Sequence, residues 1–525
     1  MLKLRKFGTS IKQIFTREER VWFLFPFPFV VFLFILSFVS YWPIINNSFV
    51  SDDYSFISIY SDVTLSDPRP FLYSSIPDFV RPISMMTWWI QIQIFGTAPT
   101  PGHVINILLH AGNASLLFLL LKRLSASTIA AAFASCLFVV TPLGPEVVTF
   151  VTGRTDLLPM FFILLTLTFY FIYLEKGSRL SMAVSLFCAF LAFFSKEQAM
   201  ILFFLFPAIE ILYGPNSQSL LSPRQQHRDE NVPYSRIILA DLGMLVRRPP
   251  IAIFMGFFIA SFLIRLAFLG NMGGYQPIIG VPNIHATVRS LRTLLAPMNI
   301  QIFSAAAIHK FAVFSSILGL LSLIALLSGW RKAPTRLKRL WVFLAIFSLV
   351  SIMPVAWRIF VVGVGNDLDM SRFFYSCLAG LLPMMTIALF DFHDKGRAYG
   401  LIISLILVFL LSINIYVLNI NNRLWEKSAA ISWAIPEQTV NQLPDPPQDS
   451  KLYYQDVPSW IGVWCFGTDI EPAIRQKYGR NDLVVRRVDE QISEGPVPPS
   501  ETGDGYLFDY DSDSGVLILK RGPEW

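Results

Sequence analysis

Residues Val21–Ile45 read VWFLFPFPFVVFLFILSFVSYWPII and contain no charged side chain. A helix that crosses the hydrocarbon core of a bilayer needs about 20 apolar residues, so this stretch is long enough to span a membrane. It is longer than the apolar core of a typical signal peptide, and it lacks a clear small-residue cleavage site. We therefore predict that it is retained as the first transmembrane helix.

The composition of the whole chain agrees with this prediction. Of its 525 residues, 54% are hydrophobic and only 15% are charged, whereas soluble domains carry about 25% charged residues. The net charge of +6 comes from Lys and Arg that cluster beside apolar segments, which is typical of membrane topology rather than of nucleic-acid binding. We expect membrane lipids around the chain and no nucleic acid as a partner.

Hydropathy predicts an all-α polytopic fold with about eleven transmembrane helices. They are expected at residues 21–43, 103–121, 127–142, 157–174, 180–195, 198–213, 250–269, 311–328, 340–362, 373–391 and 399–419. Residues 81–96, RPISMMTWWIQIQIFG, are apolar but short. We predict an interfacial or re-entrant helix there, with Trp88 and Trp89 at the depth of the lipid headgroups.

The distribution of Lys and Arg predicts the orientation of these helices. Basic residues gather in the N-terminal tail and in every second connection, namely at Lys3, Arg5, Lys6, Lys12, Arg17, Arg20, Lys122, Arg123, Lys176, Arg179, in the 214–248 and 331–339 loops, and at Lys395 and Arg397. Cytoplasmic loops are enriched in such residues. The N-terminus is therefore expected in the cytoplasm and, after an odd number of helices, the C-terminus outside. In a bacterium the membrane would be the plasma membrane.

The composition changes after about residue 420. From there the chain is polar, with proline-rich stretches and short alternating runs such as LVVRRV and GVLILK, which are typical of strands. We predict a transmembrane domain at 1–419 and a small extracytoplasmic α/β domain at 420–525. No 34-residue repeat is visible there, so no helical solenoid is expected.

The polar side chains that could take part in catalysis or binding all map to one predicted face of the membrane, the outer one. They are Asp52, Asp53, Arg81, His103, Glu146, Arg154, Asp156, Lys196, Glu197 and Arg372. A random distribution would divide them between the two faces, whereas an enzyme that acts at the outer face would collect them there.

The acidic pair Asp52 and Asp53 follows the first helix directly, in FVSDDYSFI. Paired carboxylates can supply a general base, a ligand for a divalent metal such as Mg²⁺ or Mn²⁺, or both. The alternative is a solvated loop that begins a turn. The sequence does not decide between these readings.

Two other outer connections are charged. The first, PLGPEVVTFVTGRTDL at 142–157, contains Glu146, Arg154 and Asp156. Helix capping explains Asp156, but a cation near a helix N-terminus opposes the macrodipole, so capping does not explain Arg154. The second, SKEQ, places Lys196 and Glu197 between apolar helices. A charge at mid-bilayer costs about 2.5–3.5 kcal/mol, so these two lie at the interface or line a hydrated cavity.

His103, Asn106 and His110 share one helix face. The two histidines are about 10 Å apart along the axis and cannot ligate one metal ion. We interpret His110 as a packing residue, and His103 as able to reach the outer site. Arg372, in GNDLDMSRFFY, opens a late helix on the same side, where an interfacial anchor is the alternative interpretation.

At these residues the chain resembles the C-type (GT-C) membrane glycosyltransferases, in particular the transmembrane O-mannosyltransferases that carry TPR repeats (TMTC). The matching elements, in order, are SDDYSFI, RPISMMTWW, GHVINILLHAGNASLLFLLL, FVVTPLGPEVVTFVTGRTDLL, FFSKEQAM and SRFFY. The match extends over roughly 40–210 and loosely over 365–380. Thr141 and Gly144 stand where that family shows histidines, and the TPR array is missing.

The resemblance implies transfer of a sugar from a polyprenyl-phosphate donor to a hydroxyl of a protein, lipid or glycan acceptor, with inversion. It places Asp52 as general base and Asp53 as its helper. Fixed cations that meet the charge of a leaving phosphate lower the barrier, and our candidates are Arg372, Lys196 and Arg154. The remaining site candidates are Arg81, His103, Glu146, Asp156 and Glu197.

A transporter or flippase of a lipid-linked or anionic substrate is the alternative, because intramembrane charges serve transport as well. Transporters often show internal repeats and charges at the bilayer midplane. The sequence shows no such repeat, and its charges cluster at one surface, which favours the enzyme.

Overall fold

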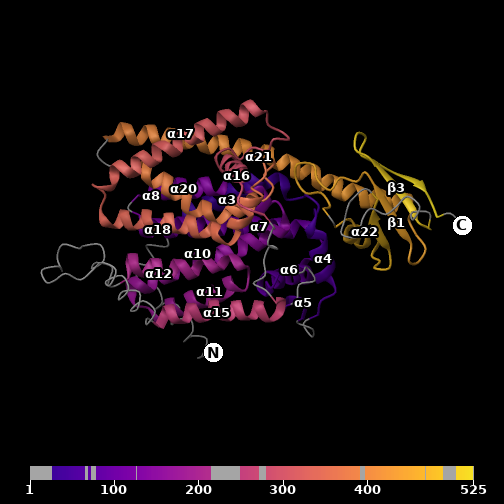
Figure 1. The fold of residues 1–525 in the computed structure, drawn as a ribbon, viewed down its shortest axis with the longest axis horizontal. Helices are drawn as coiled ribbons and strands as arrows, with labels where there is room; N and C mark the ends of the chain where they lie inside the picture. The colour runs from indigo at the N-terminus through magenta and orange to yellow at the C-terminus, as the bar shows by residue number, and fades with distance from the viewer. Residues whose placement is uncertain are drawn as a thin grey trace.

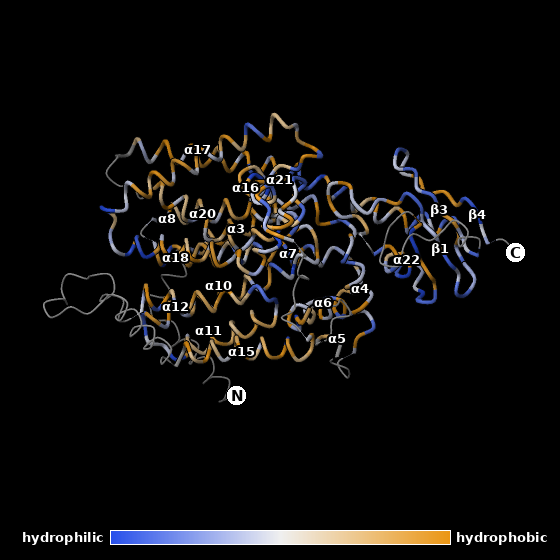
Figure 2. Tube along the Cα trace, viewed as in Figure 1, coloured by the Kyte–Doolittle hydropathy of each residue, from blue (hydrophilic) through white to orange (hydrophobic). Residues whose placement is uncertain are grey.

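The computed structural model describes residues 26–64, 69–72, 79–125, 127–214, 249–270, 280–390, 396–467, 469–488 and 504–523. The predicted basic tail, the start of the first helix, most of the 214–248 loop and Lys395 lie outside the described residues. Apolar helices dominate residues 27–442 and lie roughly alongside one another in a bundle, with a small sheet beyond one end (Figures 1 and 2).

The helices of the bundle follow the predicted order. They are α3 (Phe27–Tyr41), η1 (Trp42–Ile44), α4 (Asp52–Ser61), α5 (Arg69–Leu72), α6 (Pro82–Phe95), α7 (Pro99–Leu124), α8 (Thr128–Val139), α9 (Pro145–Val148), η2 (Val151–Gly153), α10 (Arg154–Lys176), α11 (Arg179–Phe193), η3 (Glu197–Ile201), α12 (Leu202–Tyr213), α15 (Pro249–Leu269), α16 (Ile284–Leu295), α17 (Ala305–Trp330), α18 (Thr335–Ile352), η4 (Met353–Val355), α19 (Ala356–Val361), η5 (Ser371–Phe374), α20 (Tyr375–Phe390) and α21 (Gly396–Gln442).

The predicted class, a helical multi-pass membrane protein with a small C-terminal sheet, is confirmed. Within the described residues, eight helices are long and apolar enough to cross a membrane. Thr128–Val139 and Arg179–Phe193 are apolar but shorter. Each of the eleven predicted segments coincides with a helix, but the count of eleven crossings is not confirmed.

The last predicted helix does not end at residue 419. Helix α21 runs for 47 residues, to Gln442, and leads from the bundle to the sheet (Figure 1). The polar composition after residue 420 marks a change of surroundings along the helix rather than its end, because residues such as Lys, Glu, Ala and Ser remain compatible with helical backbone.

The C-terminal sheet contains β1 (Lys451–Gln455), β2 (Val484–Arg487), β3 (Tyr506–Asp511) and β4 (Val516–Arg521) in the order β2-β1-β3-β4. β1 is parallel to β2 and β3, and β4 is antiparallel to β3. Helix α22 (Ile470–Tyr478) connects β1 to β2 and contacts α4 and α21. The predicted strands and the α/β character are confirmed.

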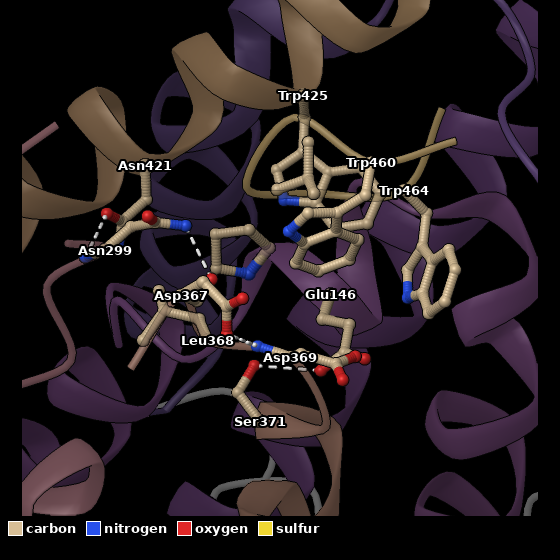
Figure 3. A pocket seen from close by; sticks show the side chains of 12 residues that line it. Glu146, Asn299, Asp367, Leu368, Asp369, Ser371, Asn421, Trp425, Trp460 and Trp464 are labelled. Carbon is tan, nitrogen blue, oxygen red and sulfur yellow. Dashed lines mark hydrogen bonds between the residues drawn. The ribbon is translucent and has the colours of Figure 1, made fainter. Parts of the chain in front are cut away.

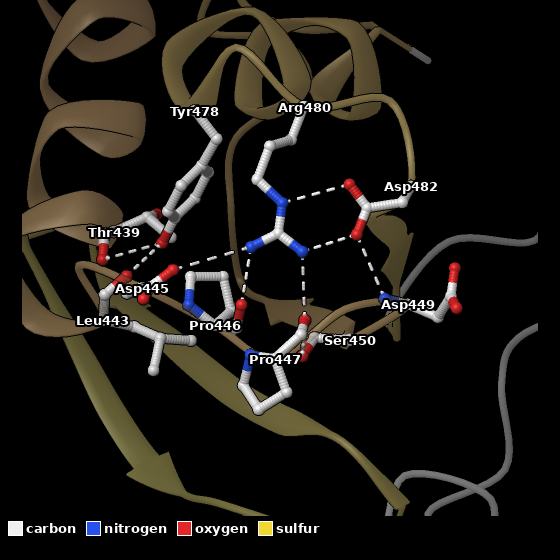
Figure 4. Close-up of polar contacts among 10 residues, drawn as sticks. All are labelled: Thr439, Leu443, Asp445, Pro446, Pro447, Asp449, Ser450, Tyr478, Arg480 and Asp482. Carbon is white, nitrogen blue, oxygen red and sulfur yellow. Dashed lines mark hydrogen bonds and ion pairs between the residues drawn. The ribbon is translucent and has the colours of Figure 1, made fainter.

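Polar contacts attach the end of α22 and the residues after it to the end of α21 and the loop that follows (Figure 4). Arg480 pairs with Asp482 through its Nε at 3.0 Å, and donates to the carbonyl oxygens of Pro446 at 2.5 Å and Pro447 at 3.2 Å. The Tyr478 hydroxyl donates to the carbonyl oxygen of Leu443 at 2.5 Å. We name the bundle end that carries α4, α22 and this sheet the sheet end.

Trp88 does not lie at the surface of the bundle, as a tryptophan in contact with lipid headgroups would. Its side chain is completely buried. Its ring centroid lies 5.3 Å from that of Phe56 and 4.9 Å from the Arg154 guanidinium. A buried cation is stabilised by the face of a tryptophan ring, and the sequence stretch around Trp88 could not reveal that partner.

Candidate active site

The structure joins six of the predicted site residues into three ion pairs at the sheet end. The pairs are Arg81–Glu197, Asp156–Lys196 and Glu146–Arg372. The partners of each pair are 40 or more residues apart in the chain. The charged connections are therefore brought together by the packing of the helices, as the prediction of a common face requires.

The first pair lies between α6 and η3. Arg81 directly precedes α6, and its Nε donates to Glu197 Oε2 at 3.0 Å while its Nη2 contacts Oε1. Burial alone would raise the pKa of Glu197. The charge and hydrogen bonds of Arg81, and the charge of nearby Arg265, outweigh burial and lower this pKa to about 2.

The second pair is fully internal. Lys196 Nζ donates to Asp156 Oδ1 at 2.6 Å, and both side chains are at most 4% exposed. Asp156 lies in the first turn of α10, which agrees with the capping interpretation. The two charges compensate each other, so Lys196 brings less free positive charge to the site than its sequence position suggests.

The third pair fixes the start of a late helix. Glu146 accepts hydrogen bonds from the backbone N–H of Arg372 at 2.9 Å and from the Ser371 hydroxyl at 3.0 Å. Burial raises the pKa of Glu146 to about 7, against the charge of Arg372 and with that of Asp369. Arg372 Nε lies 3.6 Å from Glu146 Oε1, and its side chain stays 19% exposed, more than that of Arg81 or Lys196.

The acidic pair of the first loop is divided. Asp53 is completely buried and accepts from the backbone N–H and the hydroxyl of Thr152, both at 2.7 Å. It also accepts from the backbone N–H of Val50 at 3.2 Å. Burial raises the pKa of Asp53 to about 7, although these hydrogen bonds oppose the increase. Asp53 therefore anchors the first loop to the GRTD connection.

Asp52 remains half-buried and begins α4. The preceding residue, Ser51, has a positive φ of 46°, which costs a non-glycine residue about 1–3 kcal/mol. The Ser51 N–H donates to the carbonyl oxygen of Cys465 at 2.6 Å and so holds this turn. Asp52 and Asp53 are consecutive residues at the start of α4, so their side chains point in directions about 100° apart and meet different surroundings.

The partner of Asp52 comes from the C-terminal unit. Asp469, just before α22, accepts a hydrogen bond from the Ser55 hydroxyl at 2.6 Å and lies against the Asp52 carboxyl. Burial raises its pKa to about 7, with Ser55 opposing and the charge of Asp52 adding to the increase. Asp469 is more than 400 residues from Asp52, so no local pattern could associate them.

Arg154 and His103 are internal. Arg154 is completely buried, and its Nε donates to Asn106 Oδ1 at 3.3 Å, while its Nη2 contacts Gln91 Oε1. His103 is 2% exposed, with Nε2 3.1 Å from the carbonyl oxygen of Asn47. His110 contacts the Tyr375 hydroxyl and the Val139 carbonyl oxygen. The interpretation of His110 as a packing residue is confirmed.

A narrow cleft beside Arg372 combines carboxylates with tryptophan rings (Figure 3). Its lining includes Glu146, Asp367, Asp369, Asn299, Asn421, Trp425, Trp460 and Trp464. The Trp464 side chain donates a hydrogen bond to Asp369. Burial raises the pKa of Asp369 above its ordinary value, and the charge of Arg372 only partly opposes this increase. The D-L-D run was visible in the sequence beside Arg372, but the tryptophans come from distant segments.

Arg265 was also missed. It lies in α15, with Nη1 3.6 Å from Glu197 Oε2 and a side chain that is 1% exposed. A signal was present, because an ionisable residue inside an apolar helix is a candidate functional residue by itself.

The structure does not bring Asp52 and Asp53 together as a pair of metal ligands, because Asp53 points to Thr152. Among the described residues, no three His, Cys, Asp or Glu side chains form a group that could hold a metal ion. Mg²⁺ or Mn²⁺ dependence stays a prediction.

These features define a multi-pass membrane protein with paired charges at one bundle end and a small α/β unit beside them. No protein-family model matches the chain. Over 133 residues it is 30% identical to the protein O-mannosyl-transferase Tmtc1 of Drosophila melanogaster, which is 23% of this chain and 16% of that protein. Over 137 residues it is 31% identical to the protein O-mannosyl-transferase TMTC3 of Homo sapiens, and this match covers 24% of this chain and 15% of that protein.

The predicted resemblance to TMTC-type membrane glycosyltransferases is thereby confirmed. The chain spans only about a sixth of the length of the first of these curated relatives, whose matched share is 16%.

Two proteins are among the solved structures with partial similarity to this chain. An oligosaccharyltransferase of Archaeoglobus fulgidus tethered with an acceptor peptide has a TM-score of 0.46 at 12% identity and covers 89% of this chain and 64% of its own. ArnT from Cupriavidus metallidurans has 12% identity and TM-scores of 0.39 in the apo state and 0.35 with undecaprenyl phosphate bound. The match to the apo structure covers 93% of this chain and 93% of ArnT, and the match to the lipid-bound structure covers 94% of each.

Proposed function

We propose that the protein is a membrane glycosyltransferase that transfers a sugar from a polyprenyl phosphate to an acceptor hydroxyl at the outer face of the membrane. One observation carries the proposal. The residues of the TMTC-like motifs are distant in sequence but converge at the sheet end, where six of them form three ion pairs and Asp52 stays half-buried. The sequence similarity to protein O-mannosyl-transferases supports the reaction class.

In this proposal Asp52 is the general base. An acceptor hydroxyl must lose its proton as it attacks the anomeric carbon, so a carboxylate with access to the acceptor must stand beside it. Asp52 is half-buried, whereas Asp53 is buried and occupied by Thr152. A single displacement with a single base leads to inversion at the anomeric carbon.

The leaving phosphate gains a second negative charge as the glycosidic bond breaks. Preorganised cations that meet this charge stabilise the transition state. Arg372 is our leading candidate, because it keeps partial exposure while Glu146 fixes its backbone. Lys196 contributes from within its pair with Asp156. Arg154 supports the site indirectly, by holding Asn106 and Gln91 in place.

An open polar groove offers a route for the acceptor. It has a volume of about 640 Å³ and lies between the first loop and the C-terminal unit. Tyr54 of α4 and Gln476 and Lys477 of α22 are among its lining residues. Ligand pockets occupy about 300–1,000 Å³. Asp52 and Asp469 do not line the groove themselves, but they stand at the starts of α4 and α22, the helices that contribute Tyr54 and Gln476 to it.

The test is donor hydrolysis and transfer by the purified protein. We expect that one member of a panel of polyprenyl-phosphate sugars is turned over, and that the same sugar as a nucleotide donor is not. Passage of the lipid-linked sugar across a proteoliposome membrane without cleavage of its glycosidic bond would instead identify a flippase and contradict the proposal.

Asp469→Asn is expected to change the pH dependence of transfer. The pKa of Asp469 is raised to about 7, first by burial and further by the charge of Asp52. Its ionisation as pH rises through about 7 adds negative charge beside Asp52, which favours proton transfer from the acceptor to that carboxylate. The wild-type rate should therefore rise through this range, and the uncharged asparagine should remove that rise. Initial rates from pH 5.5 to 8.5 measure it.

Asp513→Asn is the matched control, since this carboxylate lies in the exposed turn between β3 and β4 of the same unit. It should keep the wild-type profile. An unchanged profile in Asp469→Asn would show that the C-terminal unit does not tune the base.

A further inference from the structure

Another polar pocket lies at the end of the bundle opposite the sheet end. It has a volume of about 530 Å³ and is lined by the ends of α7, α10 and α12 and the start of α18. Helix α10 shows the separation, because it begins at the sheet end with Arg154 and reaches this pocket with Glu175. The predicted orientation places this end in the cytoplasm. The proposed sugar transfer uses none of the residues that line it.

Arginines dominate the charged part of the lining. Arg123, Arg336 and Arg339 contribute guanidiniums, and Glu175 contributes a carboxylate. Arg123 Nε donates to Glu175 Oε1 at 2.8 Å and its Nη2 contacts Oε2, so this carboxylate already has a bidentate partner. Arg336 donates from Nε to the carbonyl oxygen of Leu124 at 3.0 Å and from Nη2 to that of Arg123 at 2.6 Å. These two acceptors are neutral and do not cancel the charge of Arg336.

Two uncharged donor groups accompany the arginines. Tyr213 lines the pocket, and its buried hydroxyl has no hydrogen-bond partner among the described residues. Arg339 and Arg336 lie close enough to this hydroxyl for their charges to act on it. Helix α18 begins in the lining at Thr335, and Pro334 at its N-cap provides no side-chain cap. Because the backbone N–H groups of a helix N-terminus favour an anion, all these donors are complementary to an anion with several oxygen atoms.

A phosphate group carried by a lipid fits both the donors and the position of the pocket. The fork of a guanidinium matches the oxygen atoms of a phosphate. Leu124, Phe171 and Leu174 form an apolar part of the lining, and α7, α10 and α18 lie within spans that are apolar and long enough to cross a membrane. Basic pockets between such helices on the cytoplasmic side bind phospholipid headgroups. A soluble anion would leave the apolar part of the pocket uncovered.

The general enrichment of basic residues at this face does not account for the pocket. Arg331 and Lys332 belong to the same connection and are exposed, and they do not line it. Such residues attract anionic lipids only through the screened potential near the membrane surface. Arg336 and Tyr213 instead line one pocket, where the shape of a ligand matters as well as its charge.

We propose that this pocket binds the phosphate group of an anionic membrane phospholipid. Arg336, Arg339 and the Tyr213 hydroxyl contact the phosphate oxygens, and an acyl chain covers the apolar part of the lining. The lipid connects the ends of α7, α10 and α12 to the start of α18, so its binding stabilises this end of the bundle. The site is separate from the candidate active site, and its test needs neither a sugar donor nor an acceptor.

Tyr213→Phe tests the uncharged part of the site. Dioctanoyl phosphatidylglycerol and the zwitterionic dioctanoyl phosphatidylcholine are titrated onto the purified full chain in detergent. Wild type should bind the anionic lipid more tightly, and Tyr213→Phe should bind it about 3- to 10-fold more weakly than wild type. Because the hydroxyl has no partner among the described residues, the unfolding temperature of the lipid-free variant should be unchanged or higher.

Arg336→Gln tests the charged part of the site in the same titration. It should weaken binding of the anionic lipid about 10- to 100-fold, because it removes a charged donor. Arg331→Gln is the matched control, since it removes the same charge from an exposed position of the same connection. This control should bind the lipid as wild type does. Equal losses in the two arginine variants would indicate diffuse attraction to the membrane surface and overturn the proposal.

The titration has other outcomes that contradict a lipid site. Wild-type binding of phosphatidylglycerol by both Tyr213→Phe and Arg336→Gln would show that the lipid does not occupy this pocket. A clear loss of lipid-free stability in Tyr213→Phe would assign the hydroxyl to the structure of the bundle rather than to a ligand. Binding of inorganic phosphate as tightly as the phospholipid would make the pocket a site for a soluble anion.

Discussion

Replacement of Asp52 by asparagine is expected to slow sugar transfer about 10²–10⁴-fold, because asparagine keeps the shape of the side chain but cannot accept the proton of the acceptor. Asp52 is half-buried, and its side chain contacts the Ser51 hydroxyl at 3.4 Å and the carboxyl of Asp469. Expression, unfolding temperature and donor binding should therefore change little. Initial rates at saturating donor measure the effect.

Two other variants make this result specific. Asp62→Asn, at the exposed end of the same helix, should react normally. Asp53→Asn should mainly lose stability, because the carboxylate that accepts three hydrogen bonds would gain an amide donor facing the N–H groups of Val50 and Thr152. If Asp52→Asn retains normal turnover, the general base does not lie in this loop. If both variants are folded but inactive and respond to added Mn²⁺, the loop holds a metal.

Arg372→Ala is expected to lower turnover about 10²–10³-fold, the usual effect of removing one preorganised donor to a developing negative charge. The backbone of Arg372 is held by Glu146 independently of its side chain, so the variant should fold. Arg372→Lys should recover part of the activity, because a point charge replaces a bidentate fork. Single-turnover rates separate this loss from weaker donor binding.

Lys196 and Arg292 provide the comparison. Lys196→Ala should reduce turnover and stability together, since it leaves Asp156 buried without its cation. Arg292→Ala, on the amphipathic helix α16, should do neither. Wild-type turnover in a folded Arg372→Ala would return Arg372 to the role of an interfacial anchor.

The helices and strands were predictable because their signals are local. Apolar runs of about 20 residues indicate spanning helices wherever they occur, and alternating runs such as GVLILK indicate strands. Local signals did not predict the features that depend on residues distant in the chain, namely the end of α21 and the burial of Trp88. α21 continues to Gln442 because it packs against the C-terminal unit, and Trp88 is internal because Arg154 lies over its ring.

The residues of the candidate site could be predicted from the sequence, but the partner of each residue could not. Charges in apolar surroundings are rare and expensive, so Glu146, Lys196 and Arg372 could be selected from the sequence. Their partners could not, because an ion pair such as Glu146–Arg372 joins positions more than 200 residues apart.

The sequence by itself determined that this chain is a membrane protein, where its helices lie and which charged residues need an explanation. Those properties follow from the solvation of each short segment. Only the tertiary structure decided that Asp53 is an anchor while Asp52 is half-buried, that Asp469 lies against Asp52, and that Arg265 is buried beside Glu197. Burial and pairing determine the chemistry of an ionisable group, and both depend on contacts between residues that are distant in the chain.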